Sequence, residues 1–478
     1  MKILYIASEA VPFIKSGGLG DVAGALPSAL VEAGAEEAAV ILPLYQDIPQ
    51  EMKDQLTFRK EIWVPLSWRT QYCGIFSAKI GKVTYYLLDN LYYFGRKGLY
   101  GYFDDGERFA FFSRAVLEAL PHLDFMPDIL CCNDWQTGMV PMYLNRFYRT
   151  VSEDYRKIRV LFTIHNIQYQ GSFSPEITED VLGLNWGDYA GGTIRYNDSV
   201  NFMKTGISAS SWVTTVSPTY AQEIQRPEYS WGLDPILREM NNKLSGILNG
   251  IDYERYNPAK DPHLFFPYSI RKPENKSKNK EALQKLLGLP QRPNTPVIAI
   301  ISRLVDHKGM DLIGSVFAQL ISENIQLVVL GTGDWQYEEL FRRAAMDYPE
   351  KVSANICFDS DLAQKIYAGA DIFLMPSKSE PCGLSQMIAM RYGTVPVARE
   401  TGGLKDTVQP FISWEGKGNG FTFANYNAQD MLYVIRQAIQ TYQDPELWQT
   451  VQKNGMKTDF SWKKPAREYI RIFEKLLG

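Results

Sequence analysis

A glycine-rich loop near the start of the chain could bind an anion. It spans Lys15 to Val22 (KSGGLGDV) and follows a short apolar run at 3–7. Glycines between a strand and a helix let backbone N–H groups approach an anion, and the start of the helix favours negative charge. Lys15 can reach a phosphate or a sugar hydroxyl. The loop lacks both the dinucleotide fingerprint and the Walker A ending, and a turn selected for tight packing is the alternative interpretation.

Two cations follow an apolar run in the second half of the chain. Arg303 and Lys308 lie in the segment SRLVDHKG, directly after the run at 297–301. Two positive charges at the end of a strand suit a diphosphate, although a surface ion pair could also explain them. Further along, Thr401, Gly402 and Gly403 precede another helix start and offer backbone donors to the same anion.

A glutamate between these two segments is a candidate sugar-binding residue. Glu380 lies in SKSEPCGLSQ, after the apolar run at 371–375, where it could accept hydrogen bonds from sugar hydroxyls. The alternative role is an N-cap for the helix that follows. Cys382, two residues on, has no histidine close in sequence, so we expect it to pack rather than react.

The first half of the chain offers a histidine and an aspartate at strand ends. His165 and Asn166 follow the run at 160–163, and Asp134 follows the run at 129–132; the chain has only four histidines. A histidine can change its charge near neutral pH, which suits acid–base chemistry or sugar binding. The alternatives are a histidine packed in the core and an aspartate that caps a turn.

The elements that must position these residues alternate between strand and helix. Apolar runs predict strands at 3–7, 40–42, 84–88, 129–132, 160–163, 212–216, 297–301, 326–330 and 371–375. Helical patterns lie between them, for example at 20–32, 108–120 and 310–321. Such alternation predicts an α/β protein with parallel sheets, and we expect two doubly wound, Rossmann-like domains facing a central cleft. Ligands bind at the carboxyl ends of strands in such folds.

The stretch 249–294 interrupts this alternation, because it is rich in Pro, Asn and charged residues. We therefore place a domain junction near Asn249 and predict domains at 1–250 and 251–459, followed by a terminal segment at 460–478. The charged run at 271–280 is expected to be a solvated approach to a helix rather than a partner surface.

Composition excludes several classes of protein. The 478 residues are 45% hydrophobic and carry 50 Lys plus Arg against 54 Asp plus Glu, for a net charge of −4. This balance disfavours nucleic-acid binding, and no apolar run is long enough to span a membrane. The five cysteines show no metal-ligand spacing, and residues 1–10 read as a first strand rather than a signal peptide. We expect a cytoplasmic protein.

Six segments in order resemble bacterial glycogen synthase and plant starch synthase, which are GT-B glycosyltransferases. They are Lys15–Val22, His165–Gly171, Lys243–Asp252, Ser302–Gly309, Ser377–Gln386 and Thr401–Val408, and the resemblance extends from Lys2 to about Trp462. It implies transfer of glucose from ADP-glucose to the non-reducing end of an α-1,4-glucan, with retention and release of ADP. It also implies that no cofactor or metal is needed, and that the segment 460–478 is a helix packed on the first domain. The absence of a targeting extension before Lys2 favours a bacterial glycogen enzyme over a plastid precursor, although a mature plastid form would look the same.

The resemblance also assigns roles to individual residues. The catalytic group is Asp134, His165, Arg303, Lys308 and Glu380. The residues that would bind the donor are Lys15, Gly18, Asp21, Asn249, Arg303, Lys308, Phe358, Glu380, Gly383, Leu384, Thr401, Gly402 and Gly403. Phe358 would stack on the adenine ring. The residues on the acceptor and sugar side are Glu9, Asp134, His165 and Asn166.

Two departures bear on the mechanism. Related retaining enzymes often carry a second glutamate eight residues after the first, where this chain has Ile388, so the donor ribose must be held elsewhere, for example by backbone at 383–386. Asp359-Ser360-Asp361 looks like a metal-binding D-x-D motif, but it stands before a helix start, where capping is the expected role. No carboxylate nucleophile can be named, which favours front-face attack over a covalent intermediate.

Other functions remain open at the level of sequence. A glucan phosphorylase would need a lysine-bound cofactor and a longer chain. A related retaining transferase could use UDP-glucose or a small acceptor on the same fold. A non-catalytic protein that binds a glucan or a nucleotide sugar is the third alternative, and detectable turnover would exclude it.

Overall fold

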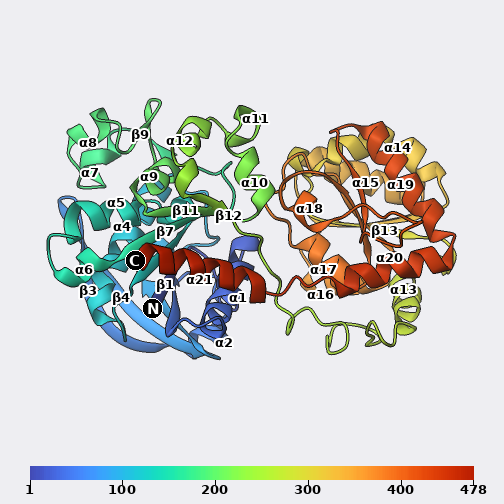
Figure 1. Cartoon of the computed structure of the whole chain (residues 1–478), viewed down its shortest axis with the longest axis horizontal. Helices are drawn as coiled ribbons and strands as arrows, with labels where there is room; N and C mark the ends of the chain where they lie inside the picture. Colours follow the sequence, from blue (N-terminus) through green and yellow to red (C-terminus); the bar gives the residue numbers. More distant parts are fainter. The chain divides into compact units, whose positions relative to one another are not determined.

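The computed structural model describes residues 1–478 and divides into two compact units (Figure 1). Unit 1 comprises Met1–Gly250 with Trp462–Gly478, and unit 2 comprises Ile251–Ser461. The sequence analysis predicted the domain boundaries after residues 250 and 459. No helix combines the length and the apolar character that a membrane crossing requires.

Unit 1 is built on a nine-stranded sheet. Its order is β12 (Leu244–Gly246), β11 (Trp212–Thr215), β7 (Arg159–Ile164), β6 (Ile129–Asn133), β1 (Lys2–Ile6), β2 (Glu37–Pro43), β5 (Val83–Asp89), β4 (Arg69–Ile80) and β3 (Thr57–Leu66). The strands from β12 to β5 pair in parallel. Every residue of β6 is buried, which explains why its sequence is apolar at successive positions.

Helices and a small second sheet complete unit 1. The helices are α1 (Gly18–Glu32), α2 (Gln50–Lys53), α3 (Leu91–Phe94), α4 (Asp105–Ala119), α5 (Met139–Tyr143), α6 (Glu153–Lys157), α7 (Ile177–Asp180), α8 (Trp186–Ala190), α9 (Phe202–Ala209), α10 (Pro218–Glu223), α11 (Pro227–Ser230), α12 (Asp234–Glu239) and α21 (Lys463–Leu477). The small antiparallel sheet has the order β8 (Ser172–Phe173), β10 (Ser199–Asn201), β9 (Arg195–Tyr196).

The last helix, α21, packs on unit 1, although the whole of unit 2 precedes it in the chain. Figure 1 shows it in red among the blue and green elements of that unit, and it contacts α1. The Lys475 ammonium lies 4.2 Å from the centre of the Trp212 ring, and Arg159 donates to the Leu476 carbonyl at 3.3 Å. The terminal helix therefore covers part of α1 and the start of strand β11.

Unit 2 has a six-stranded, entirely parallel sheet. Its order is β15 (Val352–Asn355), β14 (Gln326–Leu330), β13 (Val297–Ile301), β16 (Ile372–Met375), β17 (Val395–Arg399) and β18 (Phe421–Phe423). Its helices are α13 (Asn275–Leu286), α14 (Met310–Ser322), α15 (Trp335–Asp347), α16 (Ser360–Gly369), α17 (Ser385–Arg391), α18 (Gly402–Thr407), α19 (Ala428–Tyr442) and α20 (Pro445–Lys457). A single apolar core joins the sheet to helices α14, α15, α19 and α20.

The sequence analysis did not predict an antiparallel addition at one edge of the unit 1 sheet. Strands β3 and β4 form an antiparallel hairpin that extends the sheet beyond β5. The first five residues of β3 are exposed, so this edge strand has no continuous apolar run that could reveal it. Only one face of β3 packs against the core. Its sequence therefore lacks the continuous apolar run by which the buried strands were predicted.

The charged run at 271–280 is not simply solvated, which corrects the sequence analysis. Asn279 and Lys280 on α13 are buried, and the Lys280 ammonium lies 2.8 Å from the buried Asp371 carboxylate. Lys276 donates to the carbonyls of Ala368 and Ala370 at 3.0 Å, and burial lowers the pKa of Lys276 to about 7. Lysines in this run therefore anchor α13 to the sheet and to the end of α16.

We expect Lys280→Ala to destabilise unit 2 strongly. The change leaves the buried Asp371 carboxylate without its cation, and losing one partner of a buried ion pair costs about 3–5 kcal/mol. Urea denaturation should show the loss, and amide hydrogen exchange should locate it in Ile251–Ser461. Lys278→Ala, on the exposed side of the same helix, is the matched control and should stay within about 0.5 kcal/mol of the wild type. Equal stability of the two variants would contradict the anchoring role.

Candidate active site

The glycine-rich loop of unit 1 is held by a buried glutamate. Glu9, three residues after β1, is 3% exposed and accepts a hydrogen bond from the Ser16 backbone N–H. Burial raises the pKa of Glu9, and the hydrogen bonds from the loop oppose that rise. The Lys15 ammonium lies 3.0 Å from the Asp21 carboxylate on the first turn of α1. Four predicted residues, Glu9, Lys15, Gly18 and Asp21, thus belong to one loop.

Gly20 is required for this arrangement. A Cβ at this position would lie 2.5 Å from the Cβ of Lys15, so any other residue would displace the lysine. Gly18 is exposed at the start of α1, with its backbone open to solvent. The loop can therefore present both a lysine and a helix start to a ligand.

Asp134 and His165 lie together at the carboxyl ends of the neighbouring strands β6 and β7. The Asp134 carboxylate accepts hydrogen bonds from the backbone N–H groups of His165 at 2.7 Å and Asn166 at 3.3 Å. Asp134 has φ 56° and ψ −179°, a conformation that costs free energy in any residue but glycine and that occurs mostly at functional sites. Burial raises the pKa of Asp134 to about 7, although its two hydrogen bonds act in the opposite direction.

His165 is held as a neutral imidazole. Its Nε2 lies 2.8 Å from Oδ1 of Asn133, whose amide nitrogen donates to the carbonyls of Ile6 and Cys131. Because Asn133 presents an oxygen, Nε2 carries the proton and Nδ1 is the acceptor. Burial lowers the pKa of His165 to about 3. The ring can therefore exchange hydrogen bonds with a sugar but does not act as a cation near neutral pH.

The sequence analysis missed Asn133 and Tyr100. Asn133 is the last residue of β6, and its apolar neighbours gave no reason to single it out. Tyr100 bonds its hydroxyl to Ser8 at 2.7 Å, and its pKa is raised by burial and by the nearby Glu9 carboxylate. Asn249, which was predicted, is buried, and its Oδ1 has no hydrogen-bond partner. A buried amide oxygen of this kind is available to a ligand.

In unit 2 the central feature is an ion pair between Lys308 and Glu380. The Lys308 ammonium lies 2.6 Å from the Glu380 carboxylate, which also accepts a hydrogen bond from the Ser377 hydroxyl at 3.0 Å. Glu380 is 6% exposed. It does not cap α17, because that helix begins at Ser385 with Leu384 at its N-cap position. Glu380 is therefore engaged by a lysine and a serine rather than by a helix end.

The glycine turn at 401–403 packs directly on the Glu380 loop. A Cβ at Gly402, where φ is 45°, would lie 1.9 Å from the Glu380 carbonyl, and one at Gly403 would lie 2.2 Å from the Cys382 carbonyl. The Gly403 N–H donates to the Glu380 carbonyl at 3.1 Å. Gly383 and Leu384 continue the same loop. Only glycines allow the two backbones to approach this closely.

Arg303 and His307 lie beside the lysine. The Arg303 guanidinium is 3.4 Å from Nε2 of His307, and burial together with Lys308 and Arg303 lowers the pKa of His307 to about 4. The His307 carbonyl accepts the Lys378 N–H at 2.9 Å, which ties the β13 and β16 loops together. A neutral histidine between two cations leaves the local charge positive, as a diphosphate requires.

Phe358 and the D-x-D segment precede α16. The Phe358 side chain is 82% exposed, so it is accessible to a planar ligand. The Asp359 side chain caps α16 by accepting the Leu362 N–H at 2.9 Å, and Asp361 lies 3.1 Å from Nδ1 of His263. No three His, Cys, Asp or Glu side chains are grouped so that they could hold a metal ion.

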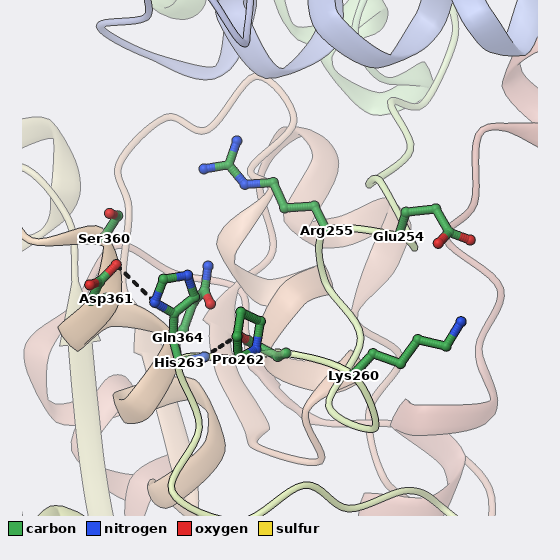
Figure 2. A pocket seen from close by; sticks show the side chains of 9 residues that line it. Glu254, Arg255, Lys260, Pro262, His263, Ser360, Asp361 and Gln364 are labelled. Atoms are coloured by element: carbon green, nitrogen blue, oxygen red, sulfur yellow. Dashed lines mark hydrogen bonds and ion pairs between the residues drawn. The ribbon is translucent and has the colours of Figure 1, made fainter. Parts of the chain in front are cut away.

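A cavity of about 400 Å³ lies beside the first turns of α16, and Figure 2 shows its lining. The lining residues are Glu254, Arg255, Lys260, Asp261, Pro262, His263, Ser360, Asp361 and Gln364. These side chains carry both signs of charge. The sequence analysis did not predict this cavity, because the loop at 254–263, which forms much of its lining, contains no recognisable motif.

Comparison with known proteins places the chain in a family. Residues 2–239 match the starch synthase catalytic domain, and residues 287–458 match glycosyl transferases group 1. Glycogen synthases of Desulforamulus reducens and Bacillus cereus are 50% and 49% identical to it over 477 residues, with 100% of this chain covered and 99% and 100% of theirs. The chain belongs to the glycogen synthase family. It is therefore a glycosyltransferase, as the resemblance implied.

Solved structures agree with this family assignment. The catalytic domain of starch synthase IV from Arabidopsis thaliana, bound to ADP and acarbose, matches with a TM-score of 0.92 and 34% identity over 99% of both chains. Sucrose-phosphate synthase from Thermosynechococcus elongatus has a TM-score of 0.62 and 16% identity over 99% and 98% of the two chains, which shows the fold alone. The predicted α/β class with two doubly wound units of GT-B type is confirmed.

The raised pKa of Asp134 predicts a pH-dependent stability. The folded chain keeps a proton on Asp134 up to a pKa of about 7, whereas the unfolded chain releases it near the ordinary aspartate pKa of 3.8. Between these values the unfolded state binds fewer protons, so the free energy of unfolding falls as the pH rises. From pH 5 to 7.5 this contribution is about 2–3 kcal/mol.

Asp134→Asn should remove that decline, because an amide stays neutral while its oxygen can still accept both N–H groups. Denaturation of both proteins at pH 5 and pH 7.5 measures the difference. Asp154→Asn, at an exposed position in the same unit, serves as the control and should keep the wild-type pH dependence. Identical pH dependence in the Asp134 variant would mean that this carboxyl is already ionised at pH 5.

Proposed function

We propose that this protein transfers glucose from ADP-glucose to the non-reducing end of an α-1,4-glucan, retaining the anomeric configuration and releasing ADP. The observation that carries the proposal is the Lys308–Glu380 pair with Arg303 and the glycine turn beside it, in a chain of the glycogen synthase family. This arrangement combines cations for a diphosphate with a carboxylate for sugar hydroxyls. The coarser conclusion, a glycosyltransferase, already follows from the family.

Lys308 and Arg303 would stabilise the leaving diphosphate. Breaking the bond between glucose and phosphate develops negative charge on the diphosphate and positive charge on the anomeric carbon. Cations fixed before the reaction starts lower the barrier, because no reorganisation is needed when the charge appears. Backbone N–H groups at Thr401 to Gly403 would supplement them, and Glu380 would hold the glucose.

The residues of unit 1 would bind the sugar and the acceptor. Lys15 and Gly18 would contact the nucleotide sugar, with Glu9 and Asp21 fixing their loop. Neutral His165 would hydrogen-bond the glucose or the acceptor, and Asp134 would hold the backbone on which His165 sits. Asn166 and Asn249 would complete the lining, Asn249 with its unpartnered oxygen.

Front-face attack is the mechanism that the side chains favour. Glu380 is engaged by Lys308 and Ser377, and Asp134 by two backbone N–H groups, so neither carboxylate is free to attack an anomeric carbon. The acceptor hydroxyl would then attack on the side from which the diphosphate leaves, which retains configuration without a covalent intermediate.

ADP is the proposed nucleotide because the starch synthase IV structure was solved with ADP bound and because Phe358 offers an exposed ring to a base. We propose no metal and no other cofactor, since Arg303 and Lys308 can neutralise the diphosphate. The protein would work in the cytoplasm on ADP-glucose and glycogen or starch, without nucleic acid or membrane.

The first test measures glucose incorporation into glycogen from ADP-glucose and from UDP-glucose, side by side in excess EDTA. We expect strong transfer from ADP-glucose that EDTA does not reduce. Preference for UDP-glucose would contradict the nucleotide assignment, and loss of activity in EDTA would contradict the metal-free mechanism. Transfer only to a small sugar acceptor would replace the glucan by that acceptor, and no transfer from either donor would favour a binding-only role.

A double-mutant cycle tests the pair. Lys308→Ala and Glu380→Gln should each lower kcat about 10²- to 10³-fold, because the first removes a cation from the leaving diphosphate and the second removes the carboxylate that holds the glucose. Since the two side chains contact each other at 2.6 Å, the double variant should lose much less than the product of the single effects.

Lys285→Ala, an exposed lysine of unit 2, is the matched control for loss of one positive charge and should retain wild-type kcat. Circular dichroism would verify that each variant is folded. Wild-type turnover in Lys308→Ala would remove the leaving-group role, and strictly multiplicative losses would show that the two residues act separately.

A further inference from the structure

Trp231 combines a strained backbone conformation with an exposed aromatic side chain. It is the residue that ends α11, where its backbone is left-handed with φ 51° and ψ 37°, and its side chain is 60% exposed. A bulky residue in the left-handed region is strained, and glycine or asparagine is usual at such helix ends. Because its ring is mostly exposed, Trp231 also buries little apolar surface and so contributes little to the stability of the fold.

Nothing local compensates for this choice of residue. The indole pairs with no other aromatic ring, and no hydrogen bond to its nitrogen is present. The turn itself is fixed by other groups: Ser230 donates to Asp234 at 2.9 Å and accepts the Gly232 N–H at 3.1 Å. The turn would therefore form without a tryptophan. Strain of this kind persists where surrounding structure enforces it, and it clusters at ligand sites.

A direct hydrogen bond links Trp231 to the loop that carries His165. The Gln170 amide nitrogen donates to the Trp231 carbonyl at 3.0 Å, and its oxygen accepts from Asn201 at 2.8 Å. Gln170 lies five residues after His165. The Tyr196 hydroxyl donates to the Gly232 carbonyl, which fixes the next residue of the turn.

The same loop is fixed firmly along its length, so the position of Trp231 is tied to that of His165. Asp134 holds the start of the loop through the backbone of His165. At the other end, a Cβ on Gly171 would lie 2.3 Å from the Trp135 ring, and the Gly171 carbonyl accepts the Phe202 N–H at 3.0 Å. Through Gln170, the Trp231 turn is hydrogen-bonded to the loop that begins at His165.

We propose that Trp231 is a binding residue for the glucan acceptor, with its indole stacking on a glucosyl unit of the chain that His165 helps to receive. Aromatic rings suit the apolar face of a pyranose, and a rigid ring loses little conformational entropy on binding. Gln170 is the positioning residue that ties this platform to the His165 loop. The inference rests on the proposed function, since it takes the acceptor to be an α-1,4-glucan.

The test compares Trp231→Ala, Trp231→Gly and Trp231→Phe in initial-rate assays of the full chain. With saturating ADP-glucose, the KM for maltoheptaose should rise about three- to tenfold in the alanine and glycine variants, the range expected for losing one stacking contact. The phenylalanine variant should recover most of the affinity. The KM for ADP-glucose should not change in any of them.

Measurements of protein stability distinguish a binding role of Trp231 from a structural role. Trp231→Gly relieves the left-handed strain, so its melting temperature should equal or exceed that of the wild type while acceptor binding weakens. Trp414→Ala, which removes a tryptophan that is 85% exposed in unit 2, is the matched control and should change neither quantity. Calorimetric titration with maltoheptaose measures binding without turnover.

Unchanged acceptor KM and unchanged maltoheptaose affinity in folded Trp231→Ala would overturn the inference while leaving the proposed function intact. A KM for ADP-glucose that rises with the acceptor KM would also overturn it, because it would indicate a general disturbance of the site. Failure of the proposed function gives a different result, since wild-type protein would then transfer no glucose to glucans.

Discussion

Parallel strand pairing is the constraint on which the candidate site depends. In unit 1, β1, β6 and β7 are neighbours that run in the same direction, so the residues after each strand emerge at one edge of the sheet. Glu9, Asp134 and His165 follow these three strands. In unit 2, the same geometry gathers the loops after β13 and β16, and so brings Lys308 to Glu380 across 72 residues of sequence. Neither set could assemble on strands that alternated in direction.

Burial then determines what these groups can do. It keeps His165 neutral and raises the pKa of Asp134 to about 7, so neither side chain is fully charged at neutral pH. Unit 2 differs, because the buried Glu380 forms an ion pair with the partly exposed Lys308, and Arg303 adds a further cation beside them.

Much of this could be predicted from the sequence, because buried parallel strands leave continuous apolar runs and the chemistry follows each run directly. The β3–β4 hairpin could not be predicted in this way, since half of β3 is exposed. Asn133 was missed because it belongs to an apolar strand and acts only through the His165 ring. The burial of Lys276 and Lys280 was not predicted. A charged run in the sequence does not reveal the distant carbonyls and the carboxylate that its lysines contact in the folded protein. Trp231 stands out only when its backbone conformation is known.

The position of α21 has a consequence for how the protein is made. Unit 1 is discontinuous, because its last helix lies beyond the whole of unit 2 in the chain. During synthesis the first 250 residues leave the ribosome with one flank near α1 and Trp212 uncovered. Unit 2 can fold as a continuous segment while that surface of unit 1 is still uncovered. The first unit to emerge is thus completed only after unit 2 has been translated, because its last helix follows unit 2 in the chain.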